Sequence, residues 1–207
     1  LGPLADLMDL SGENRSLVAH GVDRLIAAPR AGVTALCAVA GTTPDKLTSD
    51  GISFSLSPRL NAAGRMGDPE VALDALMTLD DVEAEDVVRR LDEMNRERQH
   101  LEADLSEAAL ALADRTWSGE RAIVVWDEGW HEGVKGIVAS RLVNRFGVPS
   151  FLFTVEDGVA HGSGRSIPGI DLFEAVTSFS HLLPRSGGHT AAVGVTLTAA
   201  DLEAFRE

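Results

Sequence analysis

The chain has 207 residues, of which 44% are hydrophobic and 24% are charged. This composition is typical of a folded protein and excludes the disordered, collagen-like and disulfide-rich classes. No apolar run approaches the roughly 20 residues of a membrane span, so we expect no membrane partner. The single cysteine, Cys37, can form neither an internal disulfide nor a multi-thiolate zinc site, which favours a cytoplasmic protein. The start, Leu1-Gly2-Pro3, has no initiator methionine and no signal peptide, and we expect a truncated chain.

Eighteen basic and thirty-two acidic residues give a net charge of −14. Taken alone, this charge disfavours nucleic acid as a ligand, because phosphate binding normally needs a basic surface. The excess is concentrated, since residues 66–115 hold fifteen acidic and five basic residues. Nearly all the cations are arginine, whose planar guanidinium suits phosphate groups. Coding bias or adaptation to salt would explain the arginines equally well.

The first part of the chain predicts helices and one strand. The spacing of apolar residues predicts a helix over 14–27 and a buried segment over 33–40. Residues 52–56 alternate apolar side chains with serine, which predicts a strand. Asp68-Pro69 has the form of an N-cap followed by proline at the first helical position, so a short helix is expected from there.

Residues 80–116 predict one long helix. Asp80 and Glu83 have the spacing of a capping box. Apolar residues then follow at alternating steps of four and three from Val87 to Leu112, with Arg98 interrupting the stripe. At about 1.5 Å per residue the helix would span roughly 50 Å, which indicates a connector between two domains.

Strand and helix alternate after residue 117. An apolar strand over 122–126, an amphipathic helix over 137–146 and a strand over 150–154 form a βαβ unit, which predicts a parallel or mixed sheet. The remaining expected elements are a helix near Asp171, a strand over 193–197 and a last helix from Thr198. We therefore expect a small α/β domain of about 90 residues.

Two glycine-rich segments have the composition of ligand-binding loops. Gly162–Ser166 places a guanidinium between two serines, and backbone amides, hydroxyls and arginine are the groups that an anion site needs. Gly187-Gly188-His189 permits close approach of a ligand and ends in a side chain that can donate to phosphate. An ordinary turn explains each segment at least as well on local composition, so both interpretations stay open.

The segment Pro58–Arg65 places two arginines and Asn61 around small residues. Small side chains would let a nucleic-acid strand lie close while the arginines neutralise phosphates. A helix start or tight turn with surface arginines is the alternative.

Two other positions carry a weaker signal. Trp130, next to His131, could stack on a base, although an aromatic residue at a strand end more often packs in a core. Asp6 could bind a metal or cap a helix. No complete catalytic cluster can be assembled from this chain.

Taken in order, these motifs resemble the RecJ family, the single-strand-specific 5′→3′ exonucleases of the DHH phosphoesterase superfamily. Six blocks carry the resemblance: Leu4–Asp6 with Gly12–Arg15, Pro58–Arg65, Asn95–Arg98, Trp130–Leu142, Gly162–Ser166 and Gly187–His189. The resemblance implies an α/β fold in three parts. Residues 1–79 would end the DHH catalytic lobe, residues 80–116 would form a connector helix, and residues 117–207 would form a small DHH-associated nucleic-acid-binding domain with a mixed sheet.

The resemblance also implies a chemistry and a set of site residues. Phosphodiester bonds would be hydrolysed with two divalent cations, Mn²⁺ or Mg²⁺. Asp6 would be one metal ligand, with the others outside these residues. Ser163 and Arg165, with a contribution from Arg65, would bind a 5′ phosphate. The implied nucleic-acid contacts are Arg59, Asn61, Trp130, His131, Gly187, Gly188 and His189.

The implied substrate is single-stranded DNA with a 5′ phosphate, and the implied partner is a single-strand-binding protein or a helicase. Two alternatives stay open: a DHH-family nanoRNase or cyclic-dinucleotide phosphodiesterase, and a non-catalytic relative that acts as a replication scaffold. Pro58–Arg65 and Trp130–Leu142 favour RecJ over the first alternative, and Asp6 weighs against the second. Val193, where alanine is usual, and the strong acidity depart from the family pattern.

Overall fold

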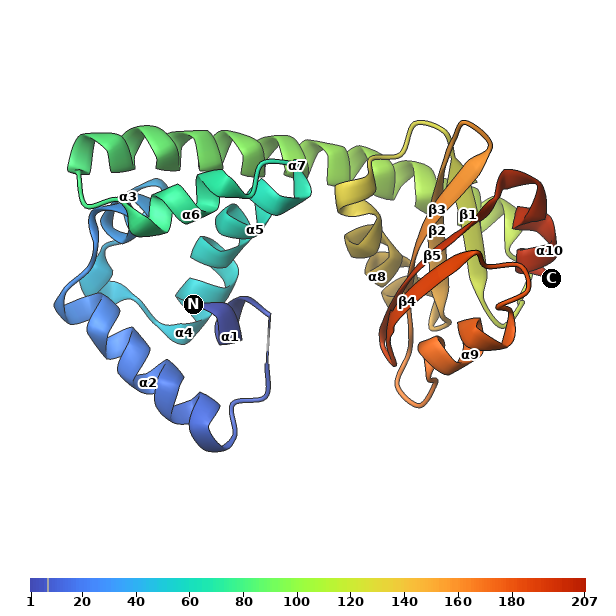
Figure 1. Ribbon diagram of the computed structural model, residues 1–207, viewed down its shortest axis with the longest axis horizontal. Coiled ribbons are helices and arrows are strands. Elements are labelled where there is room, and N and C mark those ends of the chain that lie inside the picture. Colours follow the sequence, from blue (N-terminus) through green and yellow to red (C-terminus); the bar gives the residue numbers. More distant parts are fainter. Residues whose placement is uncertain (7) are drawn as a thin grey trace. The chain divides into compact units, whose positions relative to one another are not determined.

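The computed structural model describes residues 1–6 and 8–207 (Figure 1). These residues form two compact units, Leu1–Gln99 and His100–Glu207. The long helix α7 (Asp81–Thr116) contributes residues to both units. None of the helices in the described part of the chain is long and apolar enough to cross a membrane.

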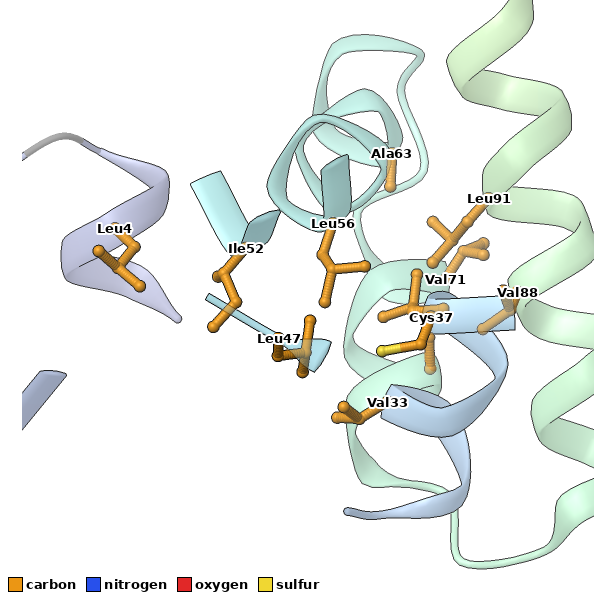
Figure 2. Packing of buried hydrophobic residues seen from close by; sticks show 12 residues of the cluster. Leu4, Val33, Cys37, Leu47, Ile52, Leu56, Ala63, Val71, Val88 and Leu91 are labelled. Atoms are coloured by element: carbon orange, nitrogen blue, oxygen red, sulfur yellow. The ribbon is translucent and has the colours of Figure 1, made fainter. Parts of the chain in front are cut away.

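The described residues of the first unit fold as helices around one apolar core. The elements before α7 are α1 (Gly2–Ala5), α2 (Gly12–Ala27), α3 (Ala31–Val39), the 3-10 turn η1 (Pro44–Lys46), α4 (Ser49–Gly51), the π-helical η2 (Ile52–Leu56), α5 (Ser57–Arg65) and α6 (Glu70–Met77). Figure 2 shows Cys37 in this buried core together with Val71, Val88 and Leu91. Burial raises the pKa of that thiol, which is the behaviour of an inert structural cysteine.

The prediction of a strand over residues 52–56 is wrong, because these residues continue the helix that begins at α4. Ile52 and Leu56 are buried, whereas Phe54 between them is 72% exposed. Burial thus repeats every four residues, which is the helical spacing, and not every two. The alternation with serine that predicts a strand is incidental to the packing.

The start of α7 keeps half of the expected capping box. The backbone amide of Glu83 donates to Asp80 Oδ1 at 2.9 Å, as predicted. The Glu83 carboxylate instead accepts from Thr78 Oγ1 at 2.5 Å. The Asp80 amide also donates to Thr78 Oγ1, at 3.2 Å. In a complete capping box this amide would donate to the Glu83 carboxylate, so the threonine hydroxyl takes the place of that carboxylate as acceptor. The preceding helix α6 begins at Glu70, one residue later than Asp68-Pro69 predicts.

The second unit is a five-stranded mixed sheet with helices on both faces. Its elements after α7 are β1 (Ile123–Asp127), the 3-10 turn η3 (Glu132–Val134), α8 (Lys135–Phe146), β2 (Ser150–Glu156), β3 (Val159–Arg165), α9 (Leu172–Ser178), β4 (Arg185–His189), β5 (Ala192–Thr198), the 3-10 turn η4 (Ala199–Asp201) and α10 (Leu202–Arg206). The strand order is β1-β2-β3-β5-β4. Only β1 and β2 run parallel, and the other neighbours are antiparallel, so the mixed α/β sheet expected from sequence is confirmed.

Each face of this sheet packs on a different set of helices, as Figure 1 shows for α8 and α9. Residues of α8 and the second part of α7 cover the β1 and β2 side chains Ile123, Val125 and Leu152. Residues of α9 and α10 pack on the opposite face, against Phe151 and Phe153. Because α8 also packs on β3, this face is covered over β1, β2 and part of β3, and it stays open over β5 and β4.

Both glycine segments that were expected to be loops lie in strands instead. Gly162 and Gly164 belong to β3 and pair with Phe153 and Phe151 of β2. A Cβ at Gly162 would come within 2.7 Å of Phe153 Cζ, and one at Gly164 within 2.9 Å of Val193 Cγ2. Glycine is needed there because aromatic rings fill the space of a side chain, a requirement that composition cannot distinguish from a turn.

We expect Gly162→Ala to lower the free energy of unfolding by about 1–3 kcal/mol, because the new methyl group overpacks against Phe153. Gly187→Ala is the matched control, since it also lies in a strand of this sheet and nothing lies within 4 Å of its Cβ position. Urea denaturation of both variants measures the effect. Equal losses for the two variants would contradict the packing argument.

Candidate nucleic-acid interface

Nine residues of β3, β5 and β4 form a grid on the α8 side of the sheet, and the first turn of α8 lies against the β3 edge of this grid. Side chains of paired residues in antiparallel strands share a face, and alternate residues of one strand do so too. The pairing gives three rows: His161, Thr196 and Arg185; Ser163, Gly194 and Gly187; Arg165, Ala192 and His189. We call these nine residues the polar platform. The sheet thus brings the two glycine segments, more than twenty positions apart in the chain, onto one surface.

Ser163 and Arg165 stand side by side on the β3 edge of the polar platform. Arg165 Nη1 donates to Ser163 Oγ at 3.2 Å and to the Gly164 carbonyl oxygen at 2.8 Å. The first turn of α8 lies against them, because a Cβ at Gly136 would fall 3.1 Å from Arg165 Cζ and 3.2 Å from Ser163 Oγ. A guanidinium, a hydroxyl and the N-terminal end of a twelve-residue helix thereby meet at one place. All three favour an anion.

A buried lysine joins α8 to β3 beside this site. The Lys135 side chain is only 2% exposed, and its ammonium group donates to the Glu132 carboxylate and to the backbone carbonyl of His161. Desolvation lowers the pKa of Lys135, while the hydrogen bond and charge of Glu132 oppose the shift. The contact ties the start of α8 to the strand that carries Ser163 and Arg165.

The Gly187-Gly188-His189 segment lies on the edge strand β4. Gly188 has φ +149°, and a Cβ there would lie 2.7 Å from the Val193 Cα atom, so no side chain fits. Gly187 has open space above it, and His189 is exposed. The first glycine and the histidine therefore face the polar platform, while Gly188 lets the neighbouring strand approach closely.

The candidates of the Pro58–Arg65 segment lie in the first unit, on α5, and differ in exposure. Arg59 is engaged internally: its Nε pairs with Asp92 Oδ1 at 2.9 Å, and its Nη1 donates to the Ser55 carbonyl at 2.7 Å. This arginine ties α5 to α7, and its expected role in nucleic-acid binding stays a prediction. Asn61 is exposed, and Arg65 is half-buried.

The two candidates before α8 also serve the fold. Trp130 is 9% exposed and packs in the apolar core of the second unit, so its ring is not placed to stack on a base. His131 caps η3, because its Nδ1 accepts from the Gly133 amide at 3.1 Å. The predicted stacking role of Trp130 is therefore corrected to core packing.

Asp6, the predicted metal ligand, is exposed at the end of α1. Among residues 1–6 and 8–207, no group of three or more histidine, cysteine, aspartate or glutamate side chains could hold a metal ion. A single carboxylate cannot satisfy the six to eight oxygen ligands or octahedral shell of a hard divalent cation. The described residues thus do not by themselves fit the two-metal centre that the resemblance implies.

Comparison with known proteins connects this geometry to a family. Residues 119–207 match the model of the DHHA1 domain. Over its whole length the chain is 38% identical to the single-stranded-DNA-specific exonuclease RecJ of Bacillus subtilis. Two crystal structures of RecJ from Thermus thermophilus, in complex with Mn²⁺ and with Mg²⁺, align with 99% of the chain at TM-scores of 0.89, with 38% and 36% identity.

The chain therefore resembles a fragment of RecJ that includes the DHH-associated domain. It spans 26% of the length of the Bacillus RecJ, and 30% and 32% of the two Thermus RecJ chains. The family resemblance and the α/β fold expected from sequence are confirmed. One of the Thermus RecJ structures is a complex with Mn²⁺ and the other is a complex with Mg²⁺, which are the two kinds of cation that the resemblance implies.

The sequence did not reveal the role of three residues at the candidate site. Lys135 and Gly136 lie inside the Trp130–Leu142 block, yet only the fold shows that they contact β3. Arg185 stands two residues before the glycine pair, and its place on the polar platform follows from strand pairing. A lysine within an apolar run was the one signal available, since such a lysine needs a buried partner.

We expect Lys135 to make the stability of the fold depend on alkaline pH. Its pKa is below the usual 10.5 in the folded state, so the unfolded state binds more protons between the two values, and stability rises with pH in that window. Relative to Lys135→Met, the wild-type chain should gain unfolding free energy as the pH rises through the alkaline range toward 10.5, the usual pKa of lysine. Urea denaturation of both proteins across this range measures the gain. A difference that does not change with pH would contradict the shift.

Proposed function

We propose that this chain forms the 5′-phosphate- and strand-binding part of a 5′→3′ exonuclease specific for single-stranded DNA. In the whole protein the enzyme would hydrolyse phosphodiester bonds with Mn²⁺ or Mg²⁺. The observation that carries the proposal is the meeting of Ser163, Arg165 and the first turn of α8 on the polar platform. The RecJ relatives, named as single-stranded-DNA-specific exonucleases, supply the reaction class.

A terminal phosphate suits this arrangement better than an internal one. A terminal phosphate carries up to two charges and three free oxygens, which can accept from a guanidinium, a serine hydroxyl and backbone amides together. Arg165 is also held in place, since Gly136 on one side and Ser163 on the other limit its position. Because these side chains are already ordered before the ligand binds, binding of the phosphate costs less conformational entropy. This lower cost supports the proposed site for the 5′ phosphate.

The other candidates take secondary roles in this proposal. Gly187 and His189 would contact the strand across the polar platform, Arg65 would add charge from the first unit, and Asp6 would be one of the metal ligands. A single-strand-binding protein or a helicase stays the predicted partner, and the cytoplasm the predicted location. Matches to RecJ exonucleases over the whole of this chain favour this function over a dinucleotide phosphodiesterase or a non-catalytic scaffold.

We expect Arg165→Ala to weaken binding of a 5′-phosphorylated single strand roughly ten- to hundredfold, because a charge-assisted contact is lost. The loss should be much smaller for the same strand with a 5′ hydroxyl, which has no terminal dianion. Fluorescence anisotropy of wild type and variant with both strands, at matched ionic strength, measures this difference. Equal losses on both strands would show that Arg165 is a backbone contact and not part of an end-recognition site.

We expect the 207-residue chain by itself to release no nucleotides from single-stranded DNA in Mn²⁺ or Mg²⁺. The physical reason is that Asp6 alone cannot hold two cations. Incubation with a 5′-labelled strand and separation of the products by electrophoresis provides the measurement. Metal-dependent release of nucleotides by the pure chain would show that the ligand set assigned here is incomplete.

A further inference from the structure

Arg185 has no role in the function proposed so far, although it borders a groove whose floor includes Gly187, a residue already proposed to contact the strand. The groove encloses about 350 Å³ on the polar platform, between η3 and the β4 edge. The side chains of Glu132, His161, Arg185 and Thr196 line its rim, and Gly187 and Gly194 form part of its floor. The rim is polar, and the floor lacks side chains.

The charges around the groove favour an anion. Arg185 is exposed, and no hydrogen bond or ion pair of its side chain is found within residues 1–6 and 8–207. Glu132, the one carboxylate on the rim, already accepts from the ammonium group of Lys135. His161 Nδ1 lies 3.3 Å from Thr196 Oγ1, which places a hydroxyl beside the ring. A cation and a hydroxyl thus remain for a ligand.

The floor is low enough for an extended chain to lie on the sheet. A Cβ at Gly187 would meet nothing within 4 Å, and one at Gly194 would meet only the Gly187 carbonyl, at 4.0 Å. Neither glycine is therefore required by packing on this face. Their effect is to leave space directly above the strands, where a sugar–phosphate backbone could approach Arg185.

The spacing of the rows separates this groove from the end-recognition site. Arg185 lies one row from Ser163 and two rows from Arg165. At about 3.3 Å per residue, two rows correspond to roughly 13 Å along the strand. The two side chains therefore start from different rows of the polar platform, and we expect Arg185 and Arg165 to contact different phosphates.

We propose that this groove binds the phosphodiester backbone of single-stranded DNA at a phosphate other than the terminal one, with Arg185 as the charged contact. The inference rests on the proposed function, because it assumes that the polar platform binds a strand. It assigns to Arg185 a role distinct from that of Arg165. Arg165 binds the 5′-terminal phosphate, and Arg185 binds the strand in the same way whether its 5′ end carries a phosphate or a hydroxyl.

Binding of an oligothymidylate strand, with a 5′ phosphate or a 5′ hydroxyl, tests the proposal by fluorescence anisotropy across a range of salt concentrations. We expect Arg185→Ala to weaken binding of both strands equally, by about three- to tenfold. The plot of log affinity against log salt should become shallower by about 0.7, the value for one phosphate contact on a single strand.

Two further variants complete the experiment. Gly194→Val fills the floor without changing any charge, and it should also weaken binding of both strands. Arg121→Ala is the matched control, because Arg121 is exposed just before β1, at the opposite edge of the sheet, and its binding should equal that of wild type. Thermal melts establish that each variant is folded.

The outcomes separate this inference from the function on which it rests. If Arg185→Ala and Gly194→Val both bind like wild type, the proposed role of the groove is wrong. The proposed function still holds in that case, provided that Arg165→Ala loses affinity mainly for the 5′-phosphorylated strand. A loss for Arg185→Ala confined to the 5′-phosphorylated strand would place Arg185 in the end-recognition site and also overturn the proposed role of the groove. If even Arg165→Ala binds both strands like wild type, the proposed function itself fails.

Discussion

Strand β3 has to satisfy two different environments, and the alternation of its side chains makes this possible. Its Gly162 and Gly164 face Phe153 and Phe151, whose rings leave no space for another side chain. Its Ser163 and Arg165 point to the other face, where they meet the first turn of α8. Because successive residues of a strand face opposite sides, close aromatic packing on one side holds the anion-binding groups in place on the other. The polar platform depends on this packing.

The buried Lys135 adds a second constraint at the same place. An ammonium group with 2% exposure is costly unless its hydrogen bonds are satisfied, and here one acceptor is the backbone of β3 itself. The charge therefore fixes the start of α8 against the strand, at the residue next to Gly136. Removing either acceptor would leave part of the buried charge without a partner, which is destabilising.

The strong acidity of the chain turns out to say little about its ligand. Much of it belongs to α7, whose carboxylates pair with arginines of neighbouring helices: Asp92 with Arg59 in the first unit, and Glu102 with Arg141 in the second. Those arginines serve the fold, and the two carboxylates that they contact are neutralised locally. The polar platform has its own composition, with arginine and histidine at both ends. The sign of the local surface, and not the net charge, decides whether phosphate can bind.

The sequence by itself indicated the resemblance to RecJ, the mixed α/β sheet and the long helix, and it singled out Ser163 and Arg165 as candidate site residues. These follow from ordered motifs and from apolar periodicity, which are local in the chain. Only the tertiary structure decided that the glycine segments are strands, that Ile52–Leu56 is helical, and that Arg59 and Trp130 serve packing. It also brought Lys135, Gly136 and Arg185 to the site. The physical reason is that the role of a glycine opposite an aromatic ring, or of a lysine beneath a strand, depends on a residue far away in the sequence. A local sequence pattern does not contain that residue.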